Sequence, residues 1–313
     1  MKETNHNQPV GNDYHIPVLY NEVVEGLDID PDGIYVDATF GGGGHSRGIL
    51  EKLSSKGRLV AFDQDADAQR NLPQDERVTF VPQNFRHLQR FLRFYKIEKI
   101  NGLLADLGVS SHQFNEADRG FSTRFEGPLD MRMDARQEQT AMSILQTYSE
   151  QRLHKLFEQW GEVTNAKTLA KHIVQNRTNS SFKTTSGLMA MLSPVVKGNP
   201  NKYFAQVFQA LRIEVNDEMG ALKELLQQSA QVLQIGGRIV VITFHSIEDR
   251  LVKNFFRWGS FEEAIDENPF ETVEKKSGFK VITRKPIVPS EEEMKRNSRS
   301  RSAKLRVAEK EWS

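Results

Sequence analysis

Four consecutive glycines at positions 41–44 separate an apolar segment that ends near Asp37 from a new apolar pattern that follows Ser46. Glycine adopts positive φ angles and lets backbone amides approach a ligand closely. A helix that starts here would present unpaired N–H groups and the positive end of its dipole to the same place. A second apolar segment ends in Asp63, about twenty residues downstream, where a carboxylate accepts hydrogen bonds from ribose hydroxyls. These residues predict a nucleotide-type site.

The residues around the glycines favour S-adenosylmethionine over other nucleotides. No Gly-Lys-Ser/Thr follows, which argues against a loop that cradles a triphosphate. Ser46 stands where a dinucleotide fingerprint would have its third glycine. The ammonium of S-adenosylmethionine suits acids such as Asp37 and Asp63, and this ligand has no phosphate to neutralise. The alternative is an ordinary strand-to-helix turn whose glycines serve chain reversal.

Two later segments place useful side chains after apolar runs. Phe85 follows one run, where an aromatic ring covers the face of an adenine or, alternatively, packs as an ordinary core residue. Asp106 follows the next run, and Ser110 comes soon after it. These groups offer acceptors and donors where a substrate would meet the cofactor. Many amino-group methyltransferases carry Asp/Asn-Pro-Pro-aromatic at this point, and that signature is absent here.

A histidine follows the most apolar strand of the sequence. Residues 238–244 are nearly continuously apolar, as expected for the interior of a parallel sheet, and His245 comes directly after them. Ser246 is expected to cap the next helix, with Asp249 three residues on as a partner similar to a capping box. His245 is therefore either a catalytic candidate or an incidental residue of a capping turn.

These candidate residues lie at the ends of strands in an alternating pattern. The expected strands are 34–39, 58–62, 78–81 and 100–105, and the expected helices between them are 46–54, 65–71 and 87–96. Alternation predicts a parallel sheet whose ligands lie beyond the carboxyl ends of the strands. Segments 279–283 and 303–307 are predicted to complete the sheet at an antiparallel end. The expected fold class is α/β with a mostly parallel, seven-stranded sheet.

The alternation is interrupted after the fourth strand. Residues 140–213 have helical character throughout, which predicts an inserted helical domain. A polar, non-periodic stretch containing Arg119 and Arg132 precedes it. Long irregular stretches in compact domains are usually functional, so a loop that faces the substrate is predicted, with a solvated surface loop as the alternative. Asn216 is expected to cap the following helix, over 217–234.

Composition limits the classes of function. The 313 residues include no cysteine, which excludes disulfides, thiol catalysis and cysteine-based metal sites. No run approaches the ~18 apolar residues of a membrane helix, so a soluble, cytoplasmic protein is expected. The 42 basic and 42 acidic residues cancel, so attraction to nucleic acid depends on local patches. Arg299, Arg301 and Lys304 belong to a basic cluster that is either such a patch or a solvated face.

An ordered set of motifs resembles the family of bacterial 16S ribosomal RNA cytosine-N4 methyltransferases, known as small-subunit methyltransferase H or MraW. The resemblance covers nearly the whole chain. Two residues depart from it, because His112 and Phe114 replace the proline and leucine expected around Gln113. The motifs are HIPVL at 15–19, DATFGGGGHS at 37–46, DLGVSS at 106–111, GPLDMRM at 127–133, FQALRI at 208–213, FHSIEDR at 244–250 and RSRSAKLR at 299–306.

The resemblance implies a Rossmann-like, S-adenosylmethionine-dependent methyltransferase that modifies the exocyclic N4 of one cytidine in the decoding region of 16S ribosomal RNA, within the 30S subunit. The polar start of the chain predicts a flexible tail over 1–14. The pattern of strands and helices predicts a methyltransferase domain over 15–112 and 214–313, with an inserted loop and helical domain over 113–213, and the resemblance implies that this insertion recognises the substrate. A homodimer is left open, and no metal is expected. The resemblance implies that the cofactor is bound by Gly43, Gly44, His45, Asp63, Phe85, Asp106 and Gln113. The argument from the glycine turn adds Asp37 and Gly41 to these expected cofactor residues.

Cytosine N4 is a poor nucleophile because its lone pair is delocalised into the ring. We expect Asp106 or a neighbouring carbonyl to accept a hydrogen bond from this amine, with His245 or a hydroxyl of Ser110 or Ser111 assisting. The base is expected to leave its stack, with Arg119 and Arg132 on the flanking phosphates. Methylation of a protein or small molecule, and a non-catalytic role in ribosome assembly, are the alternative functions.

Overall fold

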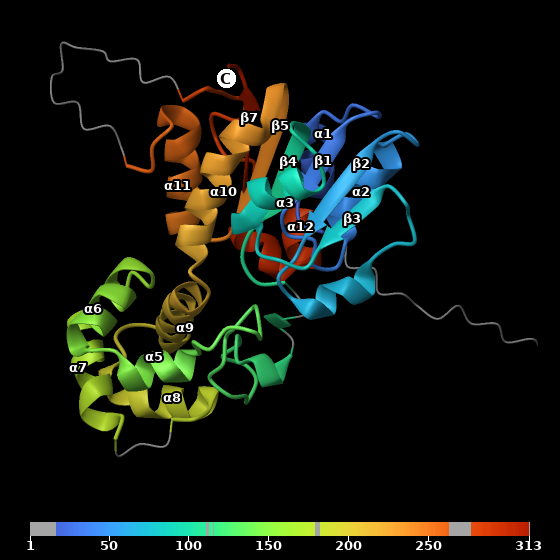
Figure 1. Cartoon of the computed structure of the whole chain (residues 1–313). Helices are drawn as coiled ribbons and strands as arrows, with labels where there is room; N and C mark the ends of the chain where they lie inside the picture. Colours follow the sequence, from blue (N-terminus) through green and yellow to red (C-terminus); the bar gives the residue numbers. More distant parts are fainter. Residues whose placement is uncertain (1–16, 111–112, 115, 179–181, 263–276, 313) are drawn as a thin grey trace, which may run out of the picture.

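The computed structural model describes residues 17–110, 113–114, 116–178, 182–262 and 277–312. The predicted tail, Ser111, His112 and most of the acidic segment 259–275 lie outside these residues. The described chain comprises a sheet with its covering helices and a separate group of helices below it (Figure 1). Among the described residues, no helix combines the length and the apolar character that a membrane span requires.

The sheet has seven strands in the order β3-β2-β1-β4-β5-β7-β6. The first five strands in this order run parallel, and β7 pairs antiparallel with both β5 and β6. The predicted α/β class and the antiparallel end are therefore confirmed. The strands are β1 (Ile34–Asp37), β2 (Arg58–Phe62), β3 (Val78–Val81), β4 (Ile100–Asp106), β5 (Leu233–Thr243), β6 (Phe279–Val281) and β7 (Lys304–Lys310).

Helices cover both faces of the sheet because successive strand residues point to opposite sides. In β4, Leu103 packs into the cluster on one face and Leu104 into the cluster on the other. The first face carries α3 (Leu88–Phe94), α10 (Glu218–Val232) and α11 (Ser246–Trp258). The second face carries α1 (Tyr20–Leu27) and α2 (Gly44–Lys52). The result is a three-layer sandwich (Figure 1).

The direction of the strand order reverses between β1 and β4. Such a reversal opens a crevice at the carboxyl ends of the strands, which is where open α/β sheets bind ligands. The chain leaves β1 into the glycine turn and leaves β4 at Asp106, so both segments reach this crevice. The 3-10 helices η1 (Ala66–Asn71) and η2 (Phe85–His87) follow β2 and β3 on the same side.

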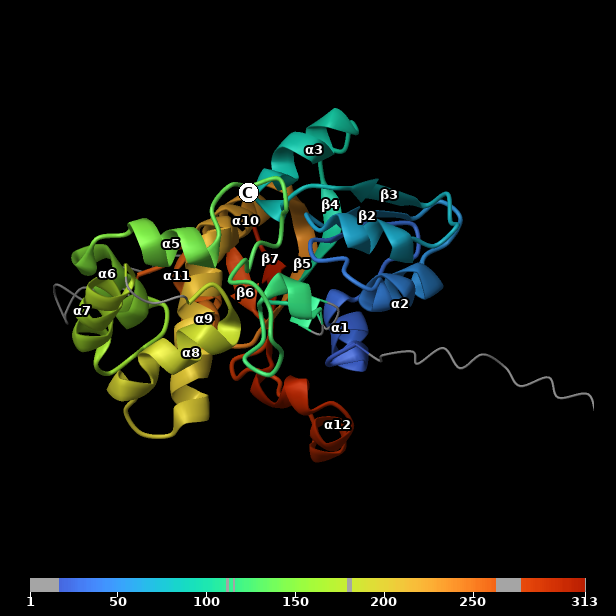
Figure 2. The same cartoon turned by 90° about the horizontal axis from the view of Figure 1, so that it is seen from below.

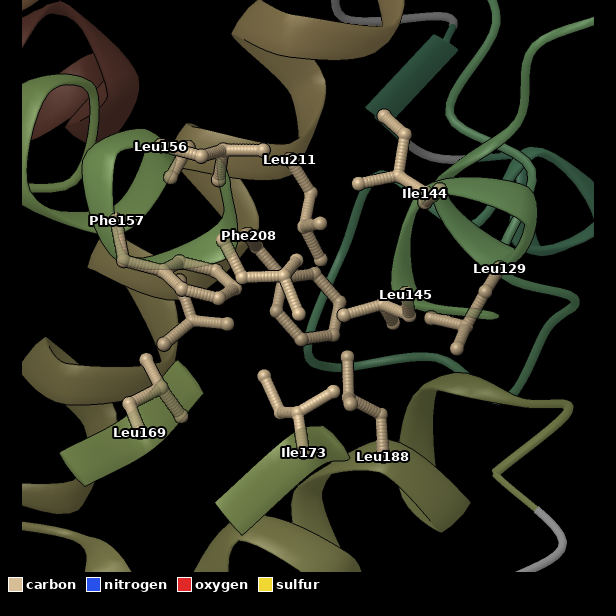
Figure 3. Packing of buried hydrophobic residues seen from close by; sticks show 14 of the residues in the cluster. Leu129, Ile144, Leu145, Leu156, Phe157, Leu169, Ile173, Leu188, Phe208 and Leu211 are labelled. Atoms are coloured by element: carbon tan, nitrogen blue, oxygen red, sulfur yellow. The ribbon is translucent and has the colours of Figure 1, made fainter. Parts of the chain in front are cut away.

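The second group of helices has a hydrophobic core of its own. Leu145, Phe157 and Leu211 are buried at its centre, where side chains from several helices converge (Figure 3). The irregular stretch before the helices is anchored to this core, because Leu129 and Met131 are buried in it. Its elements are η3 (Ala117–Arg119), α5 (Ala141–Thr147), α6 (Glu150–Gln159), α7 (Ala166–Asn176), α8 (Thr185–Leu192), η4 (Ser193–Val195) and α9 (Pro200–Asn216).

The last elements before β7 are α12 (Glu291–Arg296) and η5 (Ser298–Ser302). In Figure 2, α12 lies at the edge of the molecule opposite to α3. The segment therefore brings the predicted basic cluster to one side of the sheet. Ser300 and Ala303 are buried within it, so it packs firmly against the domain.

Two predicted helix caps are wrong. Asn216 ends α9 instead of capping α10, and the chain reverses at Asp217, which has a φ of 46°. The Asn216 amide instead donates to the carbonyls of Met131 and Arg212. The helix that follows ends at Val232, two residues before its predicted end, because β5 already begins at Leu233.

The cap of α11 is His245 and not Ser246. The His245 side chain accepts from the backbone N–H of Glu248, and the Glu248 side chain accepts from the backbone of His245, which completes a capping box. The third helical residue is therefore Glu248, and Asp249 is free to pair with Arg306 at 2.6 Å. The segment predicted as a helix over 65–71 forms the 3-10 helix η1.

Candidate active site

A cavity of about 840 Å³ lies at the crevice between β1 and β4. Gly41, Asp63, Phe85 and Asp106 all line it, so residues that follow β1, β2 and β3 or end β4 converge as predicted. Of the predicted site residues, the cavity is lined by Gly41, Gly44, His45, Asp63, Phe85, Asp106, Ser110, Gln113 and Arg299. The predicted residues outside its lining are Asp37, Gly43, Arg119, Arg132, His245, Arg301 and Lys304.

The glycine turn is built so that backbone, not side chains, faces the cavity. Gly41 has a φ of 50°, a conformation that other residues rarely adopt. A Cβ on Gly44 would lie 2.4 Å from Cγ of Pro17, so a side chain here has no room. The backbone N–H of Gly41 donates to Oδ2 of Asp63 at 2.7 Å, which ties the turn to the end of β2. Burial raises the pKa of Asp63 to about 6.

Asp37 and Gly43 lie behind the cavity wall. Asp37 is buried and accepts from the backbone N–H of Thr39 and from the hydroxyl of Ser46, at 3.0 and 2.7 Å. Gly43 is the residue before α2, and a Cβ there would meet the ring of Phe40 at 2.8 Å. Both residues therefore hold the glycine turn in shape, and their predicted direct contact with a cofactor stays a prediction.

Asp106 has the most unusual electrostatic environment of the cavity. Its side chain is 26% exposed, yet Oδ1 is buried without a hydrogen-bond partner among the described residues. Burial, reinforced by the charges of Asp37 and Glu248, raises the pKa of Asp106 to about 8. An acid whose protonation changes near neutral pH is what proton transfer requires. Its backbone N–H donates to the hydroxyl of Thr39, which fixes the end of β4 against β1.

His45 stands beside this carboxyl as a neutral ring. Its Nε2 lies 2.9 Å from the carbonyl oxygen of Val18 and donates to it, and burial lowers the pKa of the ring to about 4. Its Nδ1 is therefore unprotonated and lies 3.7 Å from Oδ2 of Asp106. His45 thus lies beside Asp106 without carrying a charge of its own.

Gln113 and Ser110 close one side of the cavity through bonds to each other. The hydroxyl of Ser110 accepts from the backbone N–H of Gln113, and Oε1 of Gln113 accepts from the backbone N–H of Ser110. Nε2 of Gln113 donates to Oδ2 of Asp65 at 2.7 Å. The predicted site residue Gln113 therefore anchors the segment after β4 to the segment after β2.

His245 belongs to a buried polar cluster next to the cavity. Its side chain is 8% exposed, and its Nε2 lies 3.1 Å from Oε1 of Glu248. Glu248 lines the cavity and so does Glu218, whose carboxylate is held by the guanidinium of Arg212 at 2.8 and 2.9 Å. Burial of Glu248 opposes its ionisation, but His245 and Arg212 outweigh burial and lower the pKa of this carboxyl.

This cluster was missed by the sequence reasoning, which expected no group of His and acids. The ligand atoms of Glu218, His245 and Glu248 lie within 4.8 Å of one another. Arg212, through its bidentate ion pair with Glu218, already places a positive charge beside this cluster, and the expected absence of a metal stays a prediction. Glu218 lies 27 positions before His245 in the sequence, so nothing local signals their contact, whereas Glu248 was detectable as the third residue after His245 in a capping box.

A family model described as the MraW methylase family matches residues 12–311. The chain belongs to the MraW methylase family. The ribosomal RNA small subunit methyltransferase H of Parabacteroides distasonis is 54% identical over 299 residues, which cover 95% of this chain and 97% of that protein. The protein of the same name from Cytophaga hutchinsonii is 52% identical, with 95% and 100% covered. That from Bacteroides thetaiotaomicron is 51% identical, with 95% and 97% covered.

Family membership makes this chain a methyltransferase of the S-adenosylmethionine-dependent class, and the cavity of this MraW methylase fits that cofactor. Its volume of about 840 Å³ falls within the ~300–1,000 Å³ typical of small-molecule sites. The carboxyl of Asp63 suits the ribose hydroxyls of this ligand, and Oδ1 of Asp106, which has no hydrogen-bond partner among the described residues, is left for a donor on a bound molecule. Phe85 adds a flat apolar surface to the same wall.

The arginines predicted to hold RNA differ in their surroundings. Arg119 donates to Oδ2 of Asp65 at 3.1 Å and to the carbonyl of Arg132. Arg132 forms a bidentate ion pair with Asp130, at 2.8 and 2.7 Å. An RNA phosphate would have to compete with these internal bonds, so the RNA role of both stays a prediction. Arg299 lines the cavity of this methylase, 4.9 Å from the ring centre of Phe114.

Proposed function

We propose that this methyltransferase transfers a methyl group from S-adenosylmethionine to the exocyclic N4 of a cytidine in the decoding region of 16S ribosomal RNA, within the 30S subunit. Membership of the MraW methylase family supports the reaction class. Relatives 51–54% identical over nearly their whole length bear the name ribosomal RNA small subunit methyltransferase H, which supports the substrate. The observation that carries the chemistry is Asp106, which lines the cavity and whose Oδ1 has no hydrogen-bond partner within the described part of the chain.

The cofactor would be held by residues around the glycine turn. When bound, it supplies an electrophilic methyl group on a positively charged sulfur. Asp63 would accept from the ribose hydroxyls, because its carboxyl already marks the end of β2 beside Gly41. Phe85 would cover the adenine, and the backbone of Gly41 and Gly44 would pass closely along the ligand. His45 and Gln113 would shape the remaining wall through their bonds to Val18 and Asp65.

Methyl transfer by displacement depends mainly on position and charge, so the chain has to hold the amine in line and receive its proton. Oδ1 of Asp106 would accept a hydrogen bond from the N4–H, which turns the nitrogen lone pair out of conjugation with the ring. The ionised carboxylate would then take the proton that the methylated amine releases. Ser110, which lines the same cavity, would bond the base from the other side.

His245 would act through Glu248 and not by touching the base. It lies outside the lining of the large cavity, and its ring contacts Glu248, which does line it. Glu248 carries a negative charge that raises the pKa of Asp106. His245 would therefore set the position and charge of Glu248, so we assign it a positioning role.

The RNA would approach the side of the sheet that carries η5. Arg299 lines the cavity, and Arg301 and Lys304 follow in the same segment. The base would leave its stack to reach Asp106. The helices of residues 113–213, with Arg119 and Arg132 at their entrance, would recognise the surrounding RNA. A ribosomal substrate implies a cytoplasmic protein, and a homodimer stays a prediction that sedimentation would test.

The experiment that tests this proposal offers labelled S-adenosylmethionine to the enzyme with undermodified 30S subunits, free 16S RNA or total cell protein. We expect label chiefly in the 30S subunits. Label in protein would favour a protein methyltransferase, and absence of transfer despite measured cofactor binding would favour a non-catalytic assembly factor.

A further inference from the structure

A second cavity, of about 240 Å³, lies beside the first. Its residues Arg301 and Lys304 belong to the side that the RNA is proposed to approach, but the cavity itself has not been given an occupant. Three parts of the chain form its wall. These are the turn after β5, with Phe244, His245 and Ser246, then Val288, and then the junction of η5 with β7, from Arg301 to Lys304.

The two cavities share a wall. Phe244 lines both of them. A Cβ placed on Gly108, two residues after Asp106, would lie 3.6 Å from Cδ2 of Phe244. The Phe244 side chain therefore connects the segment that carries the proposed acceptor to the second cavity. The two cavities are therefore adjacent, as sites for successive units of one polymer must be.

The charges around the second cavity sum to a positive value. Asp249 is shared by Arg306 at 2.6 Å and Lys304 at 3.3 Å, so one carboxylate faces two cations. Arg301 is exposed and adds a third cation. Two further acids lie nearby: Glu162 accepts from the hydroxyl of Ser246 and is paired with Arg250 at 3.4 Å, and Glu248 lies 3.1 Å from Nε2 of His245. Three carboxylates are then set against four cations, so the balance stays positive. An anionic ligand is therefore favoured.

The remaining wall is suited to a ligand that is only partly charged. Ser246 and Ser302 offer hydroxyls, and Val288, Ala303 and the Phe244 ring offer apolar surface. RNA-binding proteins recognise unstacked nucleotides in this way, with an aromatic side chain against the base and cations on the phosphate. The volume of about 240 Å³ lies below the ~300–1,000 Å³ of typical small-molecule sites, which suits one nucleotide unit and not a whole cofactor.

We propose that the second cavity binds the nucleotide adjacent to the methylated cytidine, with its phosphate on Arg301 and Lys304 and its base against Phe244. This inference rests on the proposed RNA substrate and adds a subsite to it. The subsite holds the RNA strand on both sides of the Phe244 ring, which positions the target base in the large cavity. It also gives the enzyme a means of reading one flanking base.

Two variants and one control test the subsite. Arg301→Ala removes a cation from the wall, whereas Ser302→Leu keeps every charge but fills space at an exposed position. The control is Arg93→Ala, which removes another exposed arginine. Arg93 belongs to α3, which lies at the edge of the molecule opposite to α12 in Figure 2. The measurements are KM for undermodified 30S subunits, its dependence on salt, cofactor affinity, and binding of a labelled single-stranded RNA centred on the target cytidine.

We expect both subsite variants to raise KM for subunits and to weaken binding of the labelled RNA. For Arg301→Ala the change should be about tenfold, the effect of losing one charged hydrogen-bonded contact. Arg301→Ala should also lower the salt slope by about 0.7, the value for one single-stranded phosphate contact. Cofactor affinity, thermal stability and all values for the Arg93→Ala control should stay unchanged.

Three results would overturn the subsite. Wild-type behaviour of Ser302→Leu would mean that Arg301 acts only through its general charge. An equal loss of RNA binding in the Arg93→Ala control would also mean that Arg301 acts only through its general charge. Weakened action on subunits with unchanged binding of the labelled RNA would assign the cavity to a ribosomal protein. Failure of the proposed function itself looks different, because the wild-type enzyme would then transfer no methyl group to subunits.

Discussion

Nδ1 of His45 lies 3.7 Å from Oδ2 of Asp106 in the wall of the large cavity. Because Nε2 of the ring donates to the carbonyl of Val18, the nitrogen that faces Asp106 carries no proton in the neutral ring. Burial lowers the pKa of His45 to about 4 and raises that of Asp106 to about 8, so both groups are neutral at pH 7. The cavity thus holds an acid that ionises just above neutral pH, and its Oδ1 has no hydrogen-bond partner among the residues that the structure describes.

Replacement of this acid tests its role directly. Asp106→Asn keeps the shape of the side chain but cannot accept a proton, so we expect methyl transfer to fall by about 100-fold or more at saturating cofactor. Single-turnover transfer to 30S subunits measures the effect, with cofactor affinity determined in parallel. An Asn variant that binds cofactor normally and keeps full turnover would remove Asp106 from catalysis.

The pH dependence follows from the raised pKa. Asp106 is protonated below pH 8 and ionised above it, so kcat/KM should rise with pH from 6 to 9, with a midpoint at about 8. The negative charge of Glu248 contributes to this raised pKa, so Glu248→Gln should move the midpoint to lower pH. Glu291→Gln, at an exposed position on α12, is the control and should leave the profile unchanged. A flat profile, or the same midpoint in Glu248→Gln, would contradict this account.

Phe85 is predicted to contribute to cofactor affinity. Contact of an aromatic ring with a base contributes about 1–3 kcal/mol, so Phe85→Ala should raise the Kd for S-adenosylmethionine by about tenfold or more. The matched control is Phe94→Ala, because Phe94 is 74% exposed on the outer surface of α3. Isothermal titration measures both. An unchanged Kd in Phe85→Ala would show that this ring serves only the core, which was the alternative reading of the sequence.

Asn216 is predicted to connect the helical group to the cavity. It accepts from the backbone N–H of Met133 at 2.7 Å and donates to the carbonyls of Met131 and Arg212. Asn216→Ala leaves these buried groups unpaired, so we expect a loss of about 2–4 kcal/mol in the free energy of unfolding. Asn201→Ala, at an exposed position of the same helix, should change it by less than about 0.5 kcal/mol. Chemical denaturation distinguishes the two, and equal stabilities would contradict this role.

Much of the fold follows from local patterns in the sequence. Strand alternation predicted the parallel sheet, and the acids and glycines at strand ends predicted where the cavity lies. The caps were harder to predict. Asn216 is a good capping residue by type but is overruled by contacts distant in sequence, whereas Ser246 loses the cap to its neighbour His245, which forms a local capping box with Glu248. Asn216 is drawn to Met131, 85 positions earlier. The ion pair of Arg119 with Asp65 could not be predicted for the same reason, because the two residues lie 54 positions apart in the sequence.

The central claim is that the methyl group reaches the exocyclic amine of a cytidine, and mass analysis of the product nucleoside tests it most directly. Undermodified 30S subunits are incubated with the enzyme and labelled S-adenosylmethionine, and the RNA is then digested to nucleosides. We expect label in N4-methylcytidine with the wild-type enzyme, and about 100-fold less or lower still with Asp106→Asn. Label in a nucleoside methylated on ring carbon or ribose, or in protein, would contradict it.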